Sequence, residues 1–425
     1  MMEIHPCLQN TPQSLSALQS DALAVFGAAV RSANPYTSTC TALRKLSLPR
    51  CRFVVSIGKA AVPMMQAAYD TLGTENITEA VLVTKYGHTG TFRAARCTCF
   101  EAAHPVSDDN SEKAALYVLQ KTADLTAEDT CLVLLSGGGS ALFEASLIDK
   151  KEQQEITDIL LKSGADIYEL NCVRKRLSAV KGGRLAANMH PAKVYTLALS
   201  DVPGSRPDVI ASGPTQPDPV ADAEFLNTVR RYIPDKAALL SDLPPRPVFA
   251  AQPHFDIVGD VGMLCRAAAE EAAKRGYEVR HLSADLTGDA QENVRSILCD
   301  ILRRKPHEKE KTAYIYGGET TVTVKGNGKG GRSQQAALCA ALALQQQDGI
   351  VFLAGGSDGT DGPTDAAGGV VDGTTAAVMA KNGFDAASCL ADNNAYPALR
   401  AGNALLMTGP TGTNVNDLFL ILTED

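Results

Sequence analysis

Gly58 and Lys59 stand where a short apolar run gives way to an amphipathic one. The run 53–57 is typical of a strand, and the sequence SIGKAA around the lysine is typical of a strand-to-helix turn. Because backbone N–H groups and the helix dipole favour an anion there, Lys59 is in position to bind a phosphate group. The segment is not a Walker A loop, which needs GxxxxGK[ST], since Ala60 follows the lysine. On these residues alone, a surface lysine on a turn explains the segment equally well.

A second glycine-rich turn follows the apolar run 131–135. Three successive glycines let the backbone approach a ligand without any Cβ in the way, whereas the alternative is a tight turn that needs positive φ angles. The candidate ligand-binding residues of this turn are Ser136, Gly137, Gly138, Gly139 and Ser140.

Basic residues recur between positions 171 and 184. If this segment is helical, Arg174, Lys181 and Arg184 lie within about a third of a turn of one another. They then form a stripe suited to a substrate carboxylate or to phosphates, and a solvated charged face is the alternative. Gly182 and Gly183 together cost roughly 2 kcal/mol in a helix interior, so either another group approaches them closely or the helix breaks there.

A carboxylate also follows the apolar run 195–199, where the sequence LALSD ends in Asp201. A carboxylate at the tip of a strand can hold Mg²⁺ or accept the proton of a substrate hydroxyl. Asp201 is therefore the candidate base.

The C-terminal half carries its own basic glycine loop, KGNGKGGRS at 325–333, before an expected helix at 334–344. Such a loop at a helix N-terminus is suited to an anion. The candidate nucleotide-binding residues are Glu319, Gly328, Lys329, Gly330, Gly331 and Arg332. The loop also spells GxGxxG, but a ribose-binding acid belongs at the end of the next strand, where Gly355 stands. Dinucleotide binding is therefore disfavoured.

An acidic loop follows the run 350–353. Its residues Asp358, Asp361 and Asp365 suit a hard cation that carries substrate phosphates, or they form plain Asx-turns. The loop also contains GxSxG, the motif of a hydrolase nucleophile elbow, but no histidine follows Ser357 in the chain. We predict Asp358 and Asp361 as cation ligands.

The apolar runs alternate with amphipathic segments throughout the chain. The runs are 53–57, 80–84, 131–135, 194–199, 256–258, 312–316, 350–353 and 417–422. This alternation predicts an α/β fold with a mostly parallel sheet, in which a ligand binds outside the carboxyl ends of the strands. The glycine-rich and acidic turns are expected at that edge.

The length and the proline distribution predict two domains. A chain of 425 residues with 45% hydrophobic composition is long enough for two cores. Prolines interrupt the segment 212–253, which favours a domain boundary there. We predict domains at 1–235 and 236–425, and we expect a strand near 257 to open the second one.

Composition excludes several function classes. A net charge of −8 gives no sign of a nucleic-acid partner, and the longest apolar runs are far below the roughly 18 residues of a membrane span. Eleven cysteines without a CxxC pair indicate a reducing compartment, so the protein is expected to be cytoplasmic. The sequence leaves open whether the chain forms a homodimer.

Together the turns combine basic anion sites with acidic loops, without a nucleophile–base pair or a metal–thiolate site. This combination favours phosphoryl transfer, in which a protein mainly positions reactants and neutralises charge.

Several blocks resemble the glycerate 2-kinase family (GCK/MOFRL). They are SIGKAA, HPVSDDNS, LLSGGGSAL, VRKRLSAVKGGRLA, SDVPGSRPDVIASGPTQPDP, GGETTVTV, GKGGRSQQ, GSDGTDGPTDAAG and TGPTGTNVND, in collinear order. The resemblance implies an N-terminal Rossmann-like domain, a smaller C-terminal α/β (MOFRL) domain and an active site in the cleft between them. It also implies ATP, a divalent cation such as Mg²⁺ and glycerate as substrate. The family's active-site lysine and arginine match Lys59 and Arg332.

These readings combine into a predicted mechanism. The phosphates of Mg²⁺·ATP lie against Lys59, the glycines 137–139 and the loop 328–332. The basic stripe pairs with the carboxylate of glycerate, and Asp201 accepts the proton of its 2-hydroxyl. The first alternative is an NAD(P)H-dependent hydroxypyruvate reductase, a label that family members have also carried. The second is a non-catalytic sensor of small acids.

Overall fold

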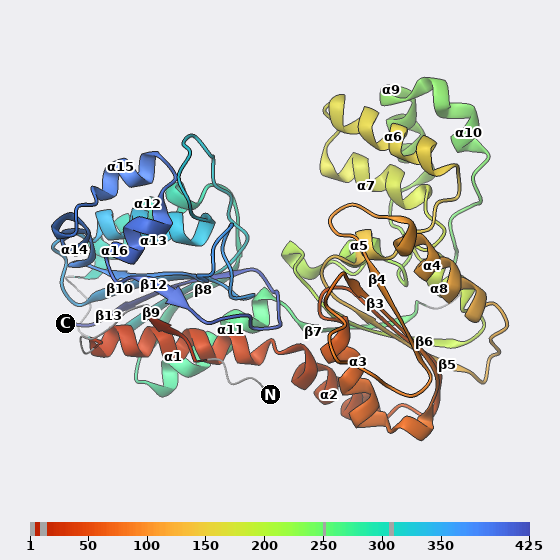
Figure 1. Ribbon diagram of the computed structural model, residues 1–425, viewed down its shortest axis with the longest axis horizontal. Helices are drawn as coiled ribbons and strands as arrows, with labels where there is room; N and C mark the ends of the chain where they lie inside the picture. The colour runs from red at the N-terminus through yellow and green to blue at the C-terminus, as the bar shows by residue number, and fades with distance from the viewer. Residues whose placement is uncertain (1–4, 9–14, 250–251, 306–309) are drawn as a thin grey trace. The chain divides into compact units, whose positions relative to one another are not determined.

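A computed structural model describes residues 5–8, 15–249, 252–305 and 310–425. The chain forms two compact units (Figure 1). One is Pro35–Val258, and the other joins the residues up to Asn34 to Gly259–Asp425. The predicted boundary at 235/236 therefore differs from the observed division, because the strand near 257 belongs to the first sheet and an N-terminal helix belongs to the second unit.

The unit Pro35–Val258 is built on a six-stranded sheet in the order β4-β3-β2-β5-β6-β7. The strands are β2 (Cys51–Ile57), β3 (Ile77–Lys85), β4 (Cys97–Ala102), β5 (Thr130–Leu135), β6 (Lys193–Leu199) and β7 (His254–Gly259). The pairs β3–β4, β2–β3, β2–β5 and β5–β6 are parallel. This is the doubly wound order of Rossmann-like folds, whose direction of winding reverses between β2 and β5. The predicted Rossmann-like architecture is confirmed.

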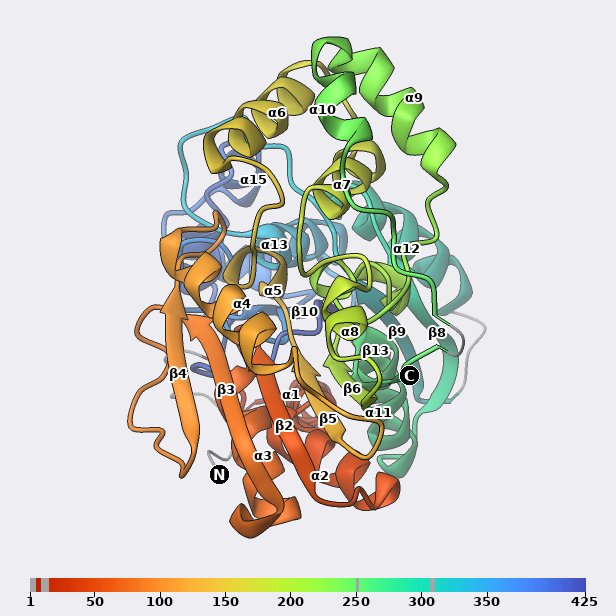
Figure 2. The same ribbon diagram turned by 90° about the vertical axis from the view of Figure 1, so that its right-hand side faces the viewer.

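Helices cover both faces of this sheet. Its core joins alternate residues of the strands to α4 (Asp109–Lys121), α5 (Gly139–Leu142) and α8 (Arg184–Asn188), which lie over one face (Figure 2). The opposite face carries α2 (Pro35–Leu46) and α3 (Ala61–Leu72) (Figure 1). All six residues of β5 are buried, as expected for a central parallel strand covered on both sides.

A separate helical layer extends this unit. It consists of α6 (Lys150–Lys162), α7 (Ile167–Arg176), α9 (Asp222–Tyr232) and α10 (Ala237–Ser241). These helices share a core of their own around Val173, Phe225 and Leu240. Helix α9 lies between the prolines of the segment 212–253.

The second unit contains a seven-stranded sheet in the order β1-β12-β11-β10-β13-β9-β8. The strands are β1 (Cys7–Leu8), β8 (Glu278–Leu286), β9 (Thr312–Gly318), β10 (Ile350–Gly356), β11 (Gly368–Asp372), β12 (Leu405–Met407) and β13 (Asp417–Thr423). Among the described strand pairs of this sheet, β8–β9 is parallel and the others are antiparallel, so the predicted mostly parallel sheet is wrong for this unit. The physical reason is that β10 passes to β11 through the acidic loop rather than a crossover helix, so β11 returns antiparallel.

Helices again lie on both faces of this sheet. Helices α1 (Ala17–Ser32) and α11 (Val261–Lys274) cover one face (Figure 1). The other face carries α12 (Ala290–Arg304), α13 (Arg332–Ala343), α14 (Thr375–Lys381), α15 (Ala386–Ala391) and α16 (Ala395–Ala401). Within the described residues, every helix is too short or too polar to cross a bilayer.

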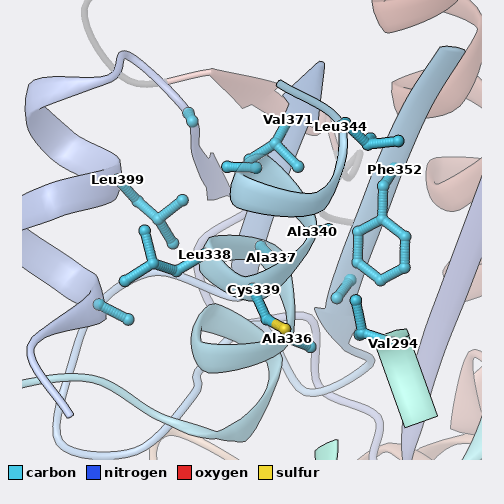
Figure 3. Packing of buried hydrophobic residues seen from close by; sticks show 14 of the residues in the cluster. Val294, Ala336, Ala337, Leu338, Cys339, Ala340, Leu344, Phe352, Val371 and Leu399 are labelled. Carbon is cyan, nitrogen blue, oxygen red and sulfur yellow. The ribbon is translucent and has the colours of Figure 1, made fainter. Parts of the chain in front are cut away.

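Helix α13 runs through the core of the second unit. Its buried run of small side chains packs between Leu399 and the strand residues Phe352 and Val371 (Figure 3). Phe352 meets Phe419 edge to face, with ring centroids 5.5 Å apart. This packing holds the start of α13, where Arg332 lies, against the sheet.

We predict that Phe352→Ala destabilises the protein by about 3–5 kcal/mol, because it leaves a cavity between α13 and the sheet. Urea unfolding measures the loss. The matched control is Val324→Ala at a side chain that is 72% exposed, which should change stability by less than about 0.5 kcal/mol. Equal effects of the two substitutions would contradict this account of the core.

Candidate functional site

Hydrogen bonds join the turn after β2 to the turn after β5, at the point where the winding reverses. The Lys59 N–H donates to the Gly137 carbonyl at 2.9 Å, and the Ala60 N–H donates to Ser136 Oγ at 3.0 Å. The Lys59 side chain is exposed, and within the described residues it makes no hydrogen bond or ion pair. The fold therefore fixes the backbone of this lysine and leaves its ammonium group available to a ligand.

The glycines of the second turn allow three polar side chains to gather. A Cβ on Gly137 would clash with the Asp201 carboxylate. A Cβ on Gly138, whose φ is +86°, would lie 3.2 Å from His104 Nε2 and 3.4 Å from Lys59 Cε. Lys59, Asp201 and His104 thus surround a turn that only glycine can form.

His104 is a site residue that the sequence reasoning did not select. It follows β4 at the same edge of the sheet as the other turns. Burial lowers the pKa of its imidazole, and the charges of Lys59 and Lys85 lower it further. His104 is therefore neutral at pH 7. The available signal was its place directly after an alternating strand, in the block HPVSDDNS.

The two serines of the second turn have structural partners. Ser136 is 1% exposed and contacts Ala60 and Ile57 through its hydroxyl group. Ser140 exchanges a hydrogen bond of 2.9 Å with Ser212. Both hydroxyl groups therefore tie the turn to neighbouring backbone and side chains, and their predicted role in ligand binding stays a prediction.

The predicted basic stripe does not form. Helix α7 ends at Arg176, Gly182 and Gly183 have positive φ angles, and α8 starts at Arg184. Lys181 is 1% exposed and pairs with Glu144, while Arg184 donates to the carbonyls of Pro244 and Pro245. Burial lowers the pKa of the Lys181 ammonium.

Arg174 remains as the one residue of this trio that faces a cavity. The cavity has a volume of about 440 Å³ and lies between α6, α7 and the segments after β4 and α5. Arg174 makes no hydrogen bond or ion pair with any residue that the structure describes. Its guanidinium group is half-buried, and burial lowers its pKa.

The second unit contains another polar cavity, of about 590 Å³, at the N-terminal end of α13. Its walls include Arg332, Asp358, Asp361 and Asp417, with Gly330 and Gly331 beside them. The loops that bring these residues together follow β9 and β10 and precede β13. The structure thus assembles the acidic loop and the predicted arginine in one place.

Two carboxylates orient Arg332. Asp417 accepts from Nε at 2.6 Å and from one terminal nitrogen at 3.2 Å, and Glu319 accepts from the other at 2.7 Å. Burial alone lowers the pKa of Arg332, but the two carboxylates outweigh it, so its pKa rises above the ordinary value. Burial raises the pKa of Asp417, against the effect of Arg332. Asp417 is a second site residue that the sequence reasoning missed, although it ends the block TGPTGTNVND.

Most of the glycine loop faces protein rather than a ligand. Asn393 accepts from the N–H groups of residues 325 and 326, and the carbonyl of Asp392 accepts from Gly328. Asn394 accepts from the N–H of Lys329, whose ammonium lies 4.8 Å from the centroid of the Tyr396 ring. Segment 392–396 therefore already occupies the N–H groups of Gly328 and Lys329, and the predicted roles of these two residues in nucleotide binding stay a prediction.

The acidic loop has a capping role at Asp361. Its two carboxylate oxygens accept from the N–H groups of Ser333 and Gln334, at 3.3 and 2.8 Å, and so cap α13. Burial raises the pKa of Asp361 to about 7, although the N–H of Gln334 opposes the shift. Both carboxylate oxygens of Asp361 therefore already accept hydrogen bonds, and its predicted role as a cation ligand stays a prediction.

Asp358 forms an Asx-turn in which one carboxylate oxygen accepts from the N–H of Thr360 at 3.0 Å. This is the alternative that the sequence left open for the loop. Among the residues described, no group of three or more His, Cys, Asp or Glu side chains has the arrangement of a metal site.

The doubly wound sheet with a basic turn at its reversal point defines a Rossmann-like α/β protein with a second α/β unit. Residues 21–240 match the family model described as Domain of unknown function (DUF4147), and residues 312–417 match the MOFRL family. The D-glycerate 2-kinase of Thermotoga maritima is 43% identical over 420 residues, which cover 96% of this chain and 98% of that protein.

A crystal structure of a glycerate kinase from Thermotoga maritima superimposes with a TM-score of 0.91 at 42% identity, covering 96% of this chain and 100% of that chain. A putative hydroxypyruvate reductase of Agrobacterium vitis is 37% identical over 415 residues, which cover 94% of this chain and 93% of that protein. The chain belongs to the glycerate 2-kinase family.

The capping role of Asp361 predicts a pH dependence of stability. Its folded-state pKa of about 7 lies above the ordinary value of 3.8, so the folded protein holds this proton more tightly than the unfolded chain. Stability should therefore fall as pH rises from about 4 to about 7, by about 1.4 kcal/mol per pH unit at most. The variant Asp361→Asn should lack the part of this fall in stability that the Asp361 carboxyl group causes.

Urea unfolding of both proteins across that pH range measures the difference. Asp348→Asn, at an exposed position, is the control and should keep the wild-type slope. Parallel slopes for the wild type and Asp361→Asn would show that residue 361 takes no part in the linkage.

Proposed function

We propose that the protein transfers the γ-phosphoryl group of ATP to the 2-hydroxyl of D-glycerate, giving 2-phosphoglycerate and ADP. The observation that carries the proposal is the ammonium of Lys59, which has no partner among the described residues and lies beside a turn of three glycines, with Asp201 and His104 next to it. The names of two relatives, a D-glycerate 2-kinase and a glycerate kinase, support the substrate and the reaction.

Lys59 and the turn at 137–139 are the proposed phosphate site. An ammonium group without a protein partner is attracted to the negative charge of a transferring phosphoryl group. The glycines support this role, because a Cβ at Gly137 or Gly138 would occupy the space between Lys59, Asp201 and His104. The site needs no nucleophile of its own, since phosphoryl transfer depends on positioning and on charge neutralisation.

Asp201 is the proposed base for the 2-hydroxyl of glycerate. Its carboxylate approaches the backbone of Gly137, which places it at the same turn as Lys59. A carboxylate there orients the hydroxyl and accepts its proton as the bond to phosphorus forms. Arg174 is the proposed partner of the substrate carboxylate, because its guanidinium group has no partner among the described residues.

Arg332 is proposed to stabilise charge on the phosphoryl group as well. Its orientation by Asp417 and Glu319 leaves 30% of the side chain exposed, on the wall of the cavity. Mg²⁺, when bound, would neutralise charge on the phosphates of ATP. Asp358 fits such a cation, because it lines the same cavity and only one of its oxygens is used in the Asx-turn.

A hydroxypyruvate reductase remains the second candidate because of the name of the Agrobacterium vitis relative. Two features favour the kinase. The first turn of the Rossmann-like sheet reads SIGKAA rather than GxGxxG. The one GxGxxG in the chain packs against segment 392–396, where a Cβ on Gly326 or Gly328 would clash.

The eleven free thiols further support our proposal of a reducing, cytoplasmic location.

The proposed reaction predicts phosphoenolpyruvate formation in a direct assay. The protein is incubated with D-glycerate, ATP and Mg²⁺, and enolase is added without phosphoglycerate mutase. Enolase accepts only the 2-phosphate, so a rise in absorbance reports both the reaction and its position. ADP release without phosphoenolpyruvate would contradict the 2-position, and NADH oxidation with hydroxypyruvate would favour the reductase.

Lys59→Ala and Arg332→Ala are each predicted to lower kcat by about 100-fold or more, because each removes a charge that stabilises the transition state. The matched control is Lys329→Ala, which removes a neighbouring lysine whose ammonium lies over Tyr396. It should keep kcat within about threefold of the wild type. Near-normal turnover of Lys59→Ala or Arg332→Ala would remove that residue from the mechanism.

A further inference from the structure

The cavity beside α7 is lined by a carboxylate and a guanidinium group that each keep a polar atom without a hydrogen-bond partner among the residues that the structure describes. Arg174 lines it from α7, and Glu144 lines it from the segment after α5. Neither group belongs to the turn that holds Lys59. Both side chains line the same cavity, and their chemistry suits a small molecule that carries an anion and a hydroxyl group.

Glu144 is 8% exposed and holds its two oxygens in different environments. Oε2 pairs with the ammonium of Lys181, which is itself 1% exposed. Oε1 is buried and has no hydrogen-bond partner among the described residues. A buried acceptor without a partner costs about 1–3 kcal/mol, so a ligand that donates a hydrogen bond to Oε1 recovers that free energy.

Arg174 supplies hydrogen-bond donors and a positive charge, whereas Glu144 supplies an acceptor. It lies in the last turn of α7 and carries donors in a planar fork, the geometry that matches a carboxylate. The exposed apolar side chains of Val106 and Leu161 form part of the rim of the same cavity. The site therefore offers a cation for an acid group and a buried acceptor for a hydroxyl group.

The cavity also adjoins the proposed phosphate site along the chain. Pro105, on its wall, is bonded to His104, which lies beside Gly138. Glu144 follows α5, the short helix that starts within the glycine turn. The walls of the cavity are therefore continuous along the chain with the turn of the proposed phosphate site.

We propose that Glu144, held by Lys181, selects acceptors by binding the 3-hydroxyl of glycerate, while Arg174 binds the carboxylate. This inference rests on the proposed kinase function and adds the residue that reads the hydroxyl left unphosphorylated. The buried Lys181–Glu144 pair thereby acts in specificity: Lys181 occupies one oxygen of Glu144 and leaves the other for the substrate. A substrate that has no hydrogen-bond donor at carbon 3 leaves Glu144 Oε1 without a hydrogen bond.

The test compares three acceptors in the wild-type protein by chromatographic measurement of ADP release. D-Lactate lacks the 3-hydroxyl, and D-3-fluorolactate has a group of similar size that cannot donate. Both should show a kcat/KM at least about 100-fold below that of D-glycerate. Either analogue used as efficiently as glycerate would overturn the proposal without any variant.

Two variants test the residue itself. Glu144→Gln keeps a hydrogen bond to Lys181, and the double variant E144L/K181M replaces the pair by apolar groups of similar length. Each should lower the glycerate-to-lactate ratio of kcat/KM by at least about tenfold, mainly through KM for glycerate. Glu112→Gln, which changes another carboxylate of the same cavity, should leave the ratio unchanged.

Thermal melts identify which variants fold. A folded Glu144 variant with the wild-type ratio overturns the proposal, while the kinase function stands. If neither variant folds, the comparison of the three acceptors in the wild type decides. Absence of glycerate phosphorylation by the wild-type protein contradicts the proposed function itself.

Discussion

The turn that carries Lys59 depends on the neighbouring turn after β5. Ser136 and Gly137 accept hydrogen bonds from the backbone of residues 59 and 60, and Gly58, with a φ of +125°, lies so close to Ser136 that any Cβ would clash. These bonds are possible because β2 and β5 are adjacent parallel strands whose carboxyl ends meet at one edge. The doubly wound sheet thus fixes the backbone of a lysine whose side chain has no partner within the described ranges.

The cationic side chains near the candidate site differ in whether they already have partners within the protein. Lys181 is paired with Glu144, and Arg184 binds backbone carbonyls, so both stabilise the fold. Arg332 is paired but still reaches a cavity, because Asp417 and Glu319 hold it from one side. Lys59 and Arg174 lack such partners within the described residues. These differences separate residues that hold the structure from those available to a substrate.

The sequence predicts the strand tips well and the partners of side chains poorly. Each apolar run of the first sheet ends within one residue of the end of its strand, because burial on both faces requires apolar residues and a turn requires glycine or aspartate. This reasoning locates Lys59, the glycines 137–139 and Asp201 correctly at one edge of a sheet. It does not find His104, because a lone histidine after a strand carries no repeat or spacing that marks it.

The remaining errors come from contacts between distant segments. Asp392, Asn393 and Asn394 accept from the N–H groups of the loop at 325–329. Pro244 and Pro245 accept from Arg184. No local pattern shows such pairings. The antiparallel second sheet has the same origin, because the direction of β11 depends on a loop that folds back rather than on the strand's own residues.

The central claim is that the transferring phosphoryl group lies at the Lys59 turn. A crystal structure with ADP, Mg²⁺, tetrafluoroaluminate and D-glycerate tests it most directly, because the planar fluoride marks the position of the phosphoryl group in transfer. We predict that a fluorine atom of the tetrafluoroaluminate accepts a hydrogen bond from Lys59 Nζ and that the ion lies against Gly138. A fluoride bound without contact to Lys59 or to the glycine turn would contradict the account.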